Sequence, residues 1–430
     1  MKASIRFQIL GPFLVVFFLG ADTTAQAQPV QASVRLVDVD GHAIRVQTAG
    51  LDLAGHGRPI VVFESGLGTP LETWTPVLSA VSEFAPAVAY DRAGIGLSEP
   101  DGLPPTPEHV AERLHALLNE IGANPPYVLV GHSLGGPYVR AFSGMFPDEI
   151  AGLVYVDPSD FTAAMADQLA PFEAIGAGEA GKEALHNEVR QLYSTSPPDI
   201  QAEWRVVEEL LDSGFASLRE LPSPRVPIAM LLAARYEEFP VSTPLPYDDR
   251  DWWEAELENR IDRLMRLAME SPEGTFAVTS GSGHYIQVDD PELVVAAIRR
   301  VVFPDVARQV REALDSGGIA GAIEVYRALE ERYPPEQFDE SLLNTIGYAL
   351  LGAGRIDDAI ATFKLNVQEY PTAANPYDSL GDGYGAAGRH EEAKASYQRA
   401  VELAEATDHP GLPLFQANLE RATEAAEGAD

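Results

Sequence analysis

The residue pattern with the clearest chemical meaning in this chain is the pentapeptide Gly-His-Ser-Leu-Gly at 131–135. It follows an apolar run at 126–130 that is typical of a buried strand, and it precedes a stretch with helical character. A serine in a tight turn between strand and helix projects its hydroxyl from the edge of a sheet, and flanking glycines allow the turn to form. The pattern predicts that Ser133 is a nucleophile and that His132 beside it only packs.

A nucleophilic serine needs a base, and the order of residues along the chain favours His284. This residue is one of nine histidines, and it follows the small residues 280–283 after a strand-like run at 275–279. Such a loop can carry an imidazole over the edge of a sheet, and an amphipathic stretch at 291–302 would anchor it. We expect His284 to take the proton of the Ser133 hydroxyl.

Two carboxylates could hold the imidazole in place. Asp157 ends a strand-like run at 152–156 and is followed by a proline, whereas Glu237 lies three residues beyond another strand-like run at 226–234. Both fit the chain order of nucleophile, acid and base. Asp157 is favoured, because an aspartate–proline corner is stiffer than a loop with two glutamates. Glu237 stays open as the alternative, and each carboxylate could instead cap a following helix.

The oxyanion that forms during attack on a carbonyl needs two backbone N–H donors. One is expected from Leu134, the residue after the nucleophile. The other is expected from Leu67, because the glycine-rich segment 65–68 follows a strand-like run at 59–63 and lets the backbone approach a reacting carbonyl.

Residues 31–303 resemble bacterial serine hydrolases of the α/β-hydrolase fold. The resemblance is carried by Ser-Gly-Leu-Gly at 65–68, by Tyr-Asp-Arg-Ala-Gly-Ile-Gly-Leu-Ser at 90–98, by the serine turn at 131–135 and by Gly-His at 283–284. In such enzymes the second of these segments shapes the floor of the site, which implies structural roles for Asp91 and Arg92.

Two positions depart from the pattern of these enzymes. Ser65 stands where a histidine is common, and the segment after the seventh strand has Ala234 and Glu237 in place of the usual glycine and aspartate. The second departure resembles the subset whose acid follows the sixth strand, which again favours Asp157. The serine at 133 disfavours relatives with an aspartate nucleophile, such as epoxide hydrolases and haloalkane dehalogenases.

The remaining pattern of this region fits an α/β fold. A hairpin signal at 40–41 joins two alternating runs, and later apolar runs alternate with helical stretches such as 108–121. This order predicts a mostly parallel sheet with helices on both faces. The strand pattern stops between 159 and 224, which predicts a helical cap over the site that selects substrates.

The last part of the chain, 304–430, shows an internal period. Gly354 and Gly388 are 34 residues apart, as are Phe363 and Tyr397. This region resembles tetratricopeptide repeats and predicts an all-α domain of about three repeats. Such a domain could bind a peptide or a partner protein, or it could serve as a dimerisation or stabilising appendage.

The N-terminus has the order of a secretory signal. Lys2 and Arg6 precede an apolar stretch at 9–19, and Ala-Gln-Ala at 25–27 forms a small-residue cleavage site. The prediction is a signal peptide at 1–27 and an exported protein, periplasmic or extracellular, with an uncleaved anchor as the alternative. The chain has no cysteine, so neither disulfides nor lipidation at a cysteine would stabilise or anchor it.

The charge balance narrows the partners. Asp and Glu number 65 against 30 Lys and Arg, which gives a net charge of −35. Such a field repels nucleic acid, so a nucleic-acid partner is not expected. The sequence has no metal-ligand spacing of Cys and His, no phosphate-binding loop and no complete dinucleotide motif, so neither a metal nor a cofactor is expected.

These observations predict an exported serine hydrolase that cleaves a small-molecule carboxylic ester or related acyl compound through Ser133, His284 and Asp157. An amidase or a hydrolase of carbon–carbon bonds would use the same residues. A different alternative is an interaction module in which the repeats matter and the hydrolase core is a scaffold.

Overall fold

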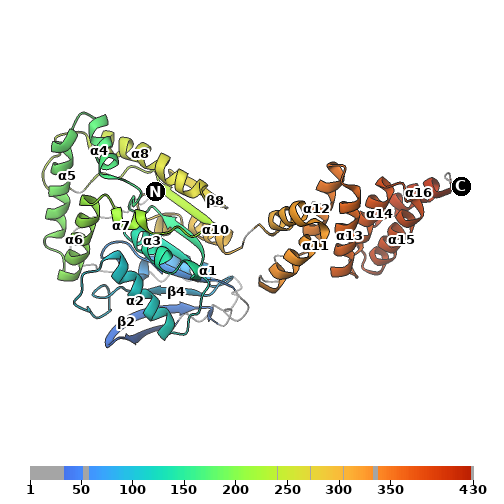
Figure 1. Cartoon of the computed structure of the whole chain (residues 1–430), viewed down its shortest axis with the longest axis horizontal. Coiled ribbons are helices and arrows are strands. Elements are labelled where there is room, and N and C mark those ends of the chain that lie inside the picture. Colours follow the sequence, from blue (N-terminus) through green and yellow to red (C-terminus); the bar gives the residue numbers. More distant parts are fainter. Residues whose placement is uncertain are drawn as a thin grey trace, which may run out of the picture. The chain divides into compact units, whose positions relative to one another are not determined.

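The computed structural model describes residues 33–51, 58–239, 241–271, 273–303, 305–332 and 338–427 (Figure 1). These residues form two compact units that divide between Val302 and Phe303. The signal peptide predicted at 1–27 lies outside the described residues. Within the described ranges, no helix is both long enough and apolar enough to cross a membrane.

The first unit is built on an eight-stranded sheet with strand order β1-β2-β4-β3-β5-β6-β7-β8. The predicted hairpin forms as β1 and β2, and β2 pairs antiparallel with β4, whereas the later pairs are all parallel. The strands are β1 (Ser33–Val39), β2 (His42–Ala49), β3 (Ile60–Glu64), β4 (Ala87–Tyr90), β5 (Tyr127–His132), β6 (Ile150–Val156), β7 (Ile228–Ala233) and β8 (Gly274–Thr279).

Helices cover both faces of the sheet. On one face α2 and α3 pack side by side, and their apolar residues join the strands in one core cluster. On the other face α1 packs beside α10, where Val301 fills the space that a side chain at Gly152 of β6 would need. These four helices are α1 (Thr75–Val81), α2 (Pro107–Glu120), α3 (Gly135–Met145) and α10 (Pro291–Val302). A short helix, α9 (Ile286–Asp289), precedes α10.

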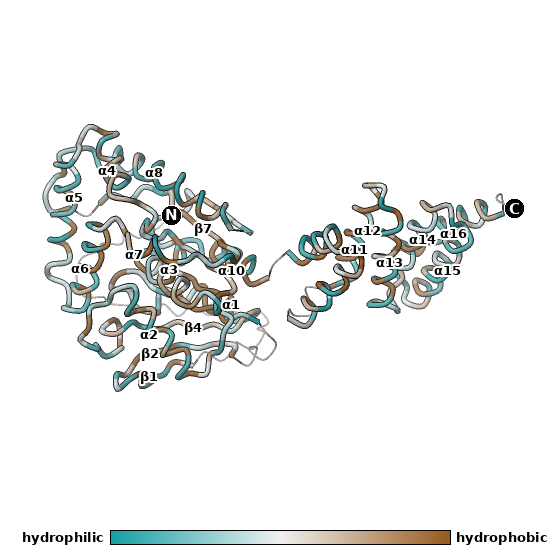
Figure 2. The backbone as a smooth tube through the Cα atoms, in the orientation of Figure 1, coloured by the Kyte–Doolittle hydropathy of each residue, from teal (hydrophilic) through white to brown (hydrophobic). Residues whose placement is uncertain are grey.

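Burial on both faces explains why the central strands read as continuous apolar runs in the sequence. Every residue of β3, β4, β5 and β7 is buried. Figure 2 shows the same contrast along the backbone, with hydrophobic colour on the inner elements and hydrophilic colour along outer helices such as α5 and α8. The predicted α/β fold class is confirmed.

The segment between β6 and β7 is helical, as predicted for the cap. It forms α4 (Met165–Ala174), α5 (Gly178–Tyr193), α6 (Pro198–Asp212) and α7 (Ala216–Glu220). A further helix, α8 (Asp249–Met269), precedes β8 and packs along α4 (Figure 1). The chain between two neighbouring parallel strands therefore leaves the sheet, forms a helical layer and returns.

The second unit is all helical, as the repeats predict. Its helices are α11 (Val306–Arg332), α12 (Glu340–Gly352), α13 (Ile356–Glu369), α14 (Ala374–Ala386), α15 (His390–Ala406) and α16 (Leu412–Glu427). Non-helical backbone at Gly318, with φ 64°, divides α11 into two helices.

The 34-residue period has a direct packing cause. The ring of Phe363 in α13 fills the space that a Cβ on Gly347 in α12 would need, and the ring of Tyr397 in α15 does the same for Gly381 in α14, at 2.5 Å. Each antiparallel pair thus joins at a glycine in its first helix and an aromatic ring in its second. The 34-residue period indicates Phe363 and Tyr397, but it does not by itself identify Gly347 and Gly381 as the residues that their rings contact.

Candidate active site

Ser133 lies in the turn between β5 and α3, and its backbone has the left-handed conformation of a tight turn. Its φ is +51°, a left-handed value that is uncommon outside glycine. A Cβ on Gly131 would lie 2.5 Å from the Gly135 carbonyl oxygen, and a Cβ on Gly135 would overlap the Glu64 carbonyl. The contacts confirm that both flanking positions need glycine, and the turn presents the serine hydroxyl at the carboxyl end of β5.

His284 lies in the loop between β8 and α9, and its imidazole joins the two other predicted residues. Its Nε2 is 2.9 Å from Ser133 Oγ, and its Nδ1 is 2.7 Å from Asp157 Oδ2. The imidazole side chain is 43% exposed, so the base faces solvent while the carboxylate behind it is buried. The three residues that the sequence analysis selected therefore form one continuous hydrogen-bonded chain.

Asp157 follows β6 and is fixed from several sides. The Ala233 N–H and Arg260 Nη2 lie 3.3 and 3.2 Å from Asp157 Oδ1, which leaves Oδ2 for the imidazole. Burial raises the pKa of this carboxyl, but the Arg260 charge and the His284 hydrogen bond outweigh burial and lower the pKa to about 2. Asp157 is thus an anion across the ordinary pH range, as an acceptor for the Nδ1–H of His284 must be.

Glu237, the alternative acid, contacts the backbone of the loop that carries His284 and not the imidazole ring. Its carboxylate lies against Gly283, accepts the His284 backbone N–H at 3.4 Å and accepts Arg235 Nη2 at 3.0 Å. No contact joins it to the imidazole among the described residues. Of the two candidate carboxylates, Asp157 is the one that contacts the imidazole of His284.

His132 has a contact that sequence reasoning missed. The residue is buried, as expected for a packing role, and its ring lies 4.7 Å from the His284 ring. Its Nε2–H donates to the His284 carbonyl oxygen at 2.9 Å, so it also ties the loop of the base to the strand of the nucleophile. Burial and the neighbouring His284 lower the pKa of His132 to about 3, which keeps the ring neutral.

The two predicted oxyanion donors lie in one apolar cluster beside the nucleophile. Leu67 and Leu134 pack with Val207 of α6, and a Cβ on Gly66 would lie 3.2 Å from Ser133 Cβ. In the described segments, the backbone N–H of neither Leu67 nor Leu134 donates to a protein acceptor. Both N–H groups are therefore free to bind an oxygen that develops charge next to Ser133.

Arg92 has the structural role expected of it, and its contacts explain that role. Its guanidinium is buried and donates to the carbonyl oxygens of Ser65 at 2.6 Å and Gly66 at 2.7 Å. Two buried carboxylates neutralise it, Glu64 at 2.7 Å and Glu203 at 2.6 Å. Asp91 likewise accepts the backbone N–H groups of the segments on either side.

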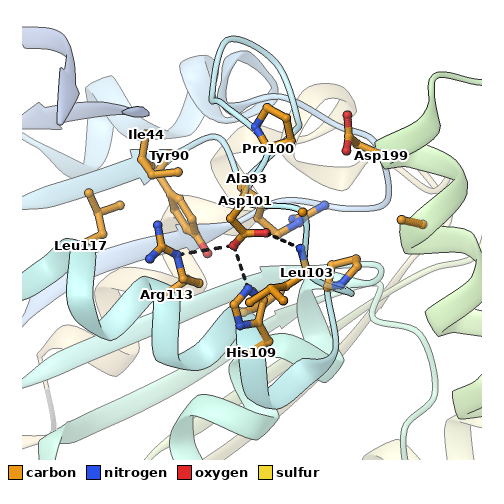
Figure 3. A pocket seen from close by; sticks show the side chains of 15 residues that line it. Ile44, Tyr90, Ala93, Pro100, Asp101, Leu103, His109, Arg113, Leu117 and Asp199 are labelled. Atoms are coloured by element: carbon orange, nitrogen blue, oxygen red, sulfur yellow. Dashed lines mark hydrogen bonds and ion pairs between the residues drawn. The ribbon is translucent and has the colours of Figure 1, made fainter. Parts of the chain in front are cut away.

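A separate surface pocket has Arg92 among its lining residues. Figure 3 shows three contacts of Asp101 in this pocket. Asp101 accepts His109 Nε2 at 2.7 Å and the Leu103 N–H at 3.0 Å, and it pairs with Arg113 at 3.6 Å. Neither Ser133 nor His284 lines it. Because these partners satisfy the central carboxylate, the cluster stabilises the fold around α2. The described residues also contain no group of three or more His, Cys, Asp or Glu side chains suited to a metal.

Comparison with known proteins gives two matches to family models. Residues 61–297 match the alpha/beta hydrolase family, and residues 374–407 match a tetratricopeptide repeat. The curated relatives include the uncharacterized protein YqjL of Bacillus subtilis, 32% identical over 121 residues that span 28% of this chain and 46% of YqjL. An AB hydrolase superfamily protein of Gibberella zeae is 22% identical over 62% of this chain and 95% of that protein.

Among solved structures, the epoxide hydrolase CorEH without ligand aligns with 63% of this chain and 98% of its own, at 14% identity and a TM-score of 0.43. The chain spans less than half of YqjL, the first of the relatives named above. The hydrolase match alone extends over more than half of the 430 residues. Taken with the eight-stranded sheet and its serine turn, this match places the chain in the alpha/beta hydrolase family.

Proposed function

We propose that this protein is a serine hydrolase that cleaves carboxylic esters or closely related acyl compounds. The observation that carries the proposal is the continuous chain from Ser133 Oγ to His284 Nε2 at 2.9 Å and from His284 Nδ1 to Asp157 Oδ2 at 2.7 Å. These distances lie within the range that direct proton transfer between nucleophile and base requires. Membership of the hydrolase family supports the same class of reaction.

The proposed reaction has two halves. Ser133 Oγ attacks the ester carbonyl while His284 Nε2 takes its proton, and the oxyanion accepts the Leu67 and Leu134 N–H groups. The imidazolium then gives that proton to the departing alcohol, which leaves an acyl group on Ser133. In the second half, water attacks the acyl group with His284 again as base, and the acid product and free Ser133 are released. Asp157 holds the imidazole in one tautomer and stabilises its charged form.

The leaving group separates this proposal from its alternatives. An amidase would use the same three residues to expel an amine, and a carbon–carbon bond hydrolase would expel a carbanion that a neighbouring carbonyl stabilises. A panel of matched esters, amides and diketones separates these reactions directly. We favour the ester because an alkoxide is a better leaving group than an amide anion or an ordinary carbanion.

The decisive experiment is labelling of the purified protein with a fluorophosphonate, with Ser133→Ala beside it. We expect labelling of the wild-type protein and none of the variant, and we expect S133A to lower ester turnover on the order of a millionfold. A series of p-nitrophenyl esters of increasing chain length then sizes the acyl pocket. Full turnover by S133A would overturn the mechanism.

Export is a further part of the proposal, and it rests on the N-terminal sequence alone. The order of basic residues, an apolar stretch and a small-residue site supports a signal cut after Ala27. N-terminal sequencing of the protein recovered from the periplasm or medium tests it. A chain that begins at Met1 and stays with the cytoplasmic fraction would contradict export.

The repeat unit supports a secondary role in binding a peptide or a partner protein. Its match to a tetratricopeptide repeat is the observation behind this role. The alternative in which the hydrolase core is only a scaffold is disfavoured, because a scaffold has no need for a hydrogen-bonded serine, histidine and aspartate. Pull-down with residues 304–430 tests the binding role, and loss of it would leave the enzymatic proposal intact.

A further inference from the structure

The cap helix α6 lies directly on the loops that form the site. A Cβ on Gly68 would lie 3.0 Å from Ile200 Cδ1, and a Cβ on Gly94 would lie 2.5 Å from Asp199 Cγ. Both glycines have positive φ, at 62° and 76°, so the two loops turn sharply where the helix touches them. Val207, two turns further along α6, packs against the same buried cluster as Leu67, which includes Leu134 and Tyr138. One face of this helix is therefore docked on the hydrolase core.

Glu203 lies in the middle of that face and is almost fully buried, at 1% exposure. Its Oε2 accepts the Gly68 backbone N–H at 2.6 Å, and its Oε1 accepts Arg92 Nε at 2.6 Å. A buried carboxylate with two short, charge-assisted contacts is held in one position. Glu203 thus connects the cap to the loop of Leu67 and to the guanidinium that holds that loop.

The contacts of Arg92 fix the direction of the Leu67 N–H. The Gly66 carbonyl and the Leu67 N–H belong to the same planar trans peptide, so they point in opposite directions. Arg92 Nη2 binds that carbonyl oxygen at 2.7 Å, which directs the Leu67 N–H away from the guanidinium. On the other side of Leu67, Glu203 holds the N–H of Gly68. The peptide that carries the oxyanion donor is therefore restrained at its own carbonyl by Arg92, and the next peptide is restrained at its N–H by Glu203.

We propose that Glu203 is a positioning residue for the oxyanion hole, so that docking of α6 completes the site. The inference rests on the proposed serine hydrolase function and adds a cap residue to its machinery. Release of Glu203 frees the Gly68 N–H and leaves Arg92 with a single carboxylate partner, Glu64. The restraint on the Leu67 N–H is then weaker, because only the Arg92 contact to the Gly66 carbonyl still directs it, while Ser133, His284 and Asp157 keep their contacts.

The test compares E203Q with the control E209Q, which changes an exposed glutamate on the same helix. Glu203 accepts the Gly68 N–H and Arg92 Nε, whereas the amide of E203Q can accept from only one of them and points its own NH2 group at the other. Rates are normalised to the number of sites that a fluorophosphonate titrates, so misfolded protein does not enter the comparison. We expect E203Q to lower kcat per site about 10- to 100-fold with KM within threefold, since loss of one oxyanion donor costs about 10²- to 10³-fold.

Two inhibitors supply a readout that a purely structural role would not change. A trifluoromethyl ketone forms an anionic hemiketal with Ser133, and its oxyanion binds in the oxyanion hole. The matching alkyl ether has no carbonyl, so it binds without forming an oxyanion. The proposal expects E203Q to weaken the ketone in parallel with kcat and to leave the ether unchanged. E203D keeps the charge on a shorter side chain, and it should also weaken the ketone and leave the ether unchanged. This variant supplies the test if E203Q folds poorly.

The outcomes separate this inference from the proposed function. An E203Q variant with wild-type kcat per site, or one that weakens both inhibitors equally, would overturn the role of Glu203 while Ser133-dependent turnover stands. A wild-type protein without Ser133-dependent turnover would overturn the proposed function, and the role of Glu203 with it.

Discussion

Arg260 of helix α8 and His284 bind opposite oxygens of one carboxylate, that of Asp157. The guanidinium lies 3.2 Å from Oδ1 and also donates to the Pro158 carbonyl at 2.8 Å, while the imidazole lies 2.7 Å from Oδ2. The positive charge stabilises the carboxylate anion, and the second contact fixes the backbone of the same corner. A helix outside the sheet thus keeps Asp157, the proposed triad acid, ionised.

Replacement of Arg260 by Gln should make both activity and stability more sensitive to acid. The folded pKa of Asp157 is about 2, below the unfolded value of 3.8, so its ionisation contributes stability above about pH 4 that is lost as the pH falls toward 2. The shift corresponds to about 2 kcal/mol at neutral pH. R260Q removes part of it, so the acid limb of kcat/KM and the acid unfolding midpoint should move to higher pH. The exposed Arg266→Gln on the same helix is the control, and identical curves for both variants would contradict the prediction.

Asp157→Asn should lower kcat by about 10⁴-fold, because an amide in place of the carboxylate leaves the imidazole in the wrong tautomer. Glu237→Gln provides the comparison, since Glu237 contacts Arg235 and the backbone N–H of His284 but not the imidazole. We expect E237Q to lose less than tenfold. Steady-state kinetics on one p-nitrophenyl ester measure both, and equal losses would argue against Asp157 as the triad acid.

His132 should make the hydrolase unit less stable in mild acid. Its folded pKa of about 3 lies below the unfolded value of 6.5, so the unfolded chain binds a proton first as the pH falls. The free energy of unfolding should therefore decrease between about pH 6.5 and pH 3, by up to about 1.4 kcal/mol per pH unit from this residue. In H132F this contribution is absent. Urea unfolding at several pH values measures the slope, and an unchanged slope in H132F would contradict the assignment.

Two glycines of one repeat helix should respond oppositely to alanine. A Cβ at Gly381 would lie 2.5 Å from the Tyr397 ring, whereas nothing lies within 4 Å of a Cβ at Gly385, in the same helix α14. G381A should destabilise the repeat unit by about 1–3 kcal/mol through overpacking. G385A should stabilise it by about 0.5–1 kcal/mol, because alanine favours the helix. Calorimetry of the full chain measures both, and a shift of the same sign in the two variants would refute the packing argument.

The parts of the site that the sequence predicts are those encoded by local patterns. Ser133 and His284 each stand in a short segment of small residues after a strand, and Asp157 ends a strand beside a proline. The turn glycines, the alternation of strands and helices and the helical segment after β6 follow from the same kind of pattern, since periodicity and turn chemistry act over a few residues.

The parts that the sequence did not reveal depend on contacts between distant segments. Glu203 reaches Gly68 across 135 residues and Arg260 reaches Asp157 across 103, and each lies in a charged amphipathic helix where many such residues face solvent. Burial of one glutamate among several becomes visible only when the helix is placed on the core. His132 was expected only to pack, because its partner is a backbone carbonyl that any residue at 284 would supply.

The strand ends that position the proposed triad also determine which part of the hydrolase unit could be exchanged. Ser133, Asp157 and His284 follow β5, β6 and β8, and hydrogen bonds between parallel strands fix those ends independently of what the intervening chain does. The segment between β6 and β7 could therefore be replaced by a module of another length and shape without moving these strand ends. An exchanged module must nevertheless bring a buried acceptor to the Gly68 N–H and to Arg92 Nε, or these two N–H groups lose the acceptor that Glu203 supplies. A module that brings a new substrate preference would therefore also have to keep the loop of the proposed oxyanion donor in place.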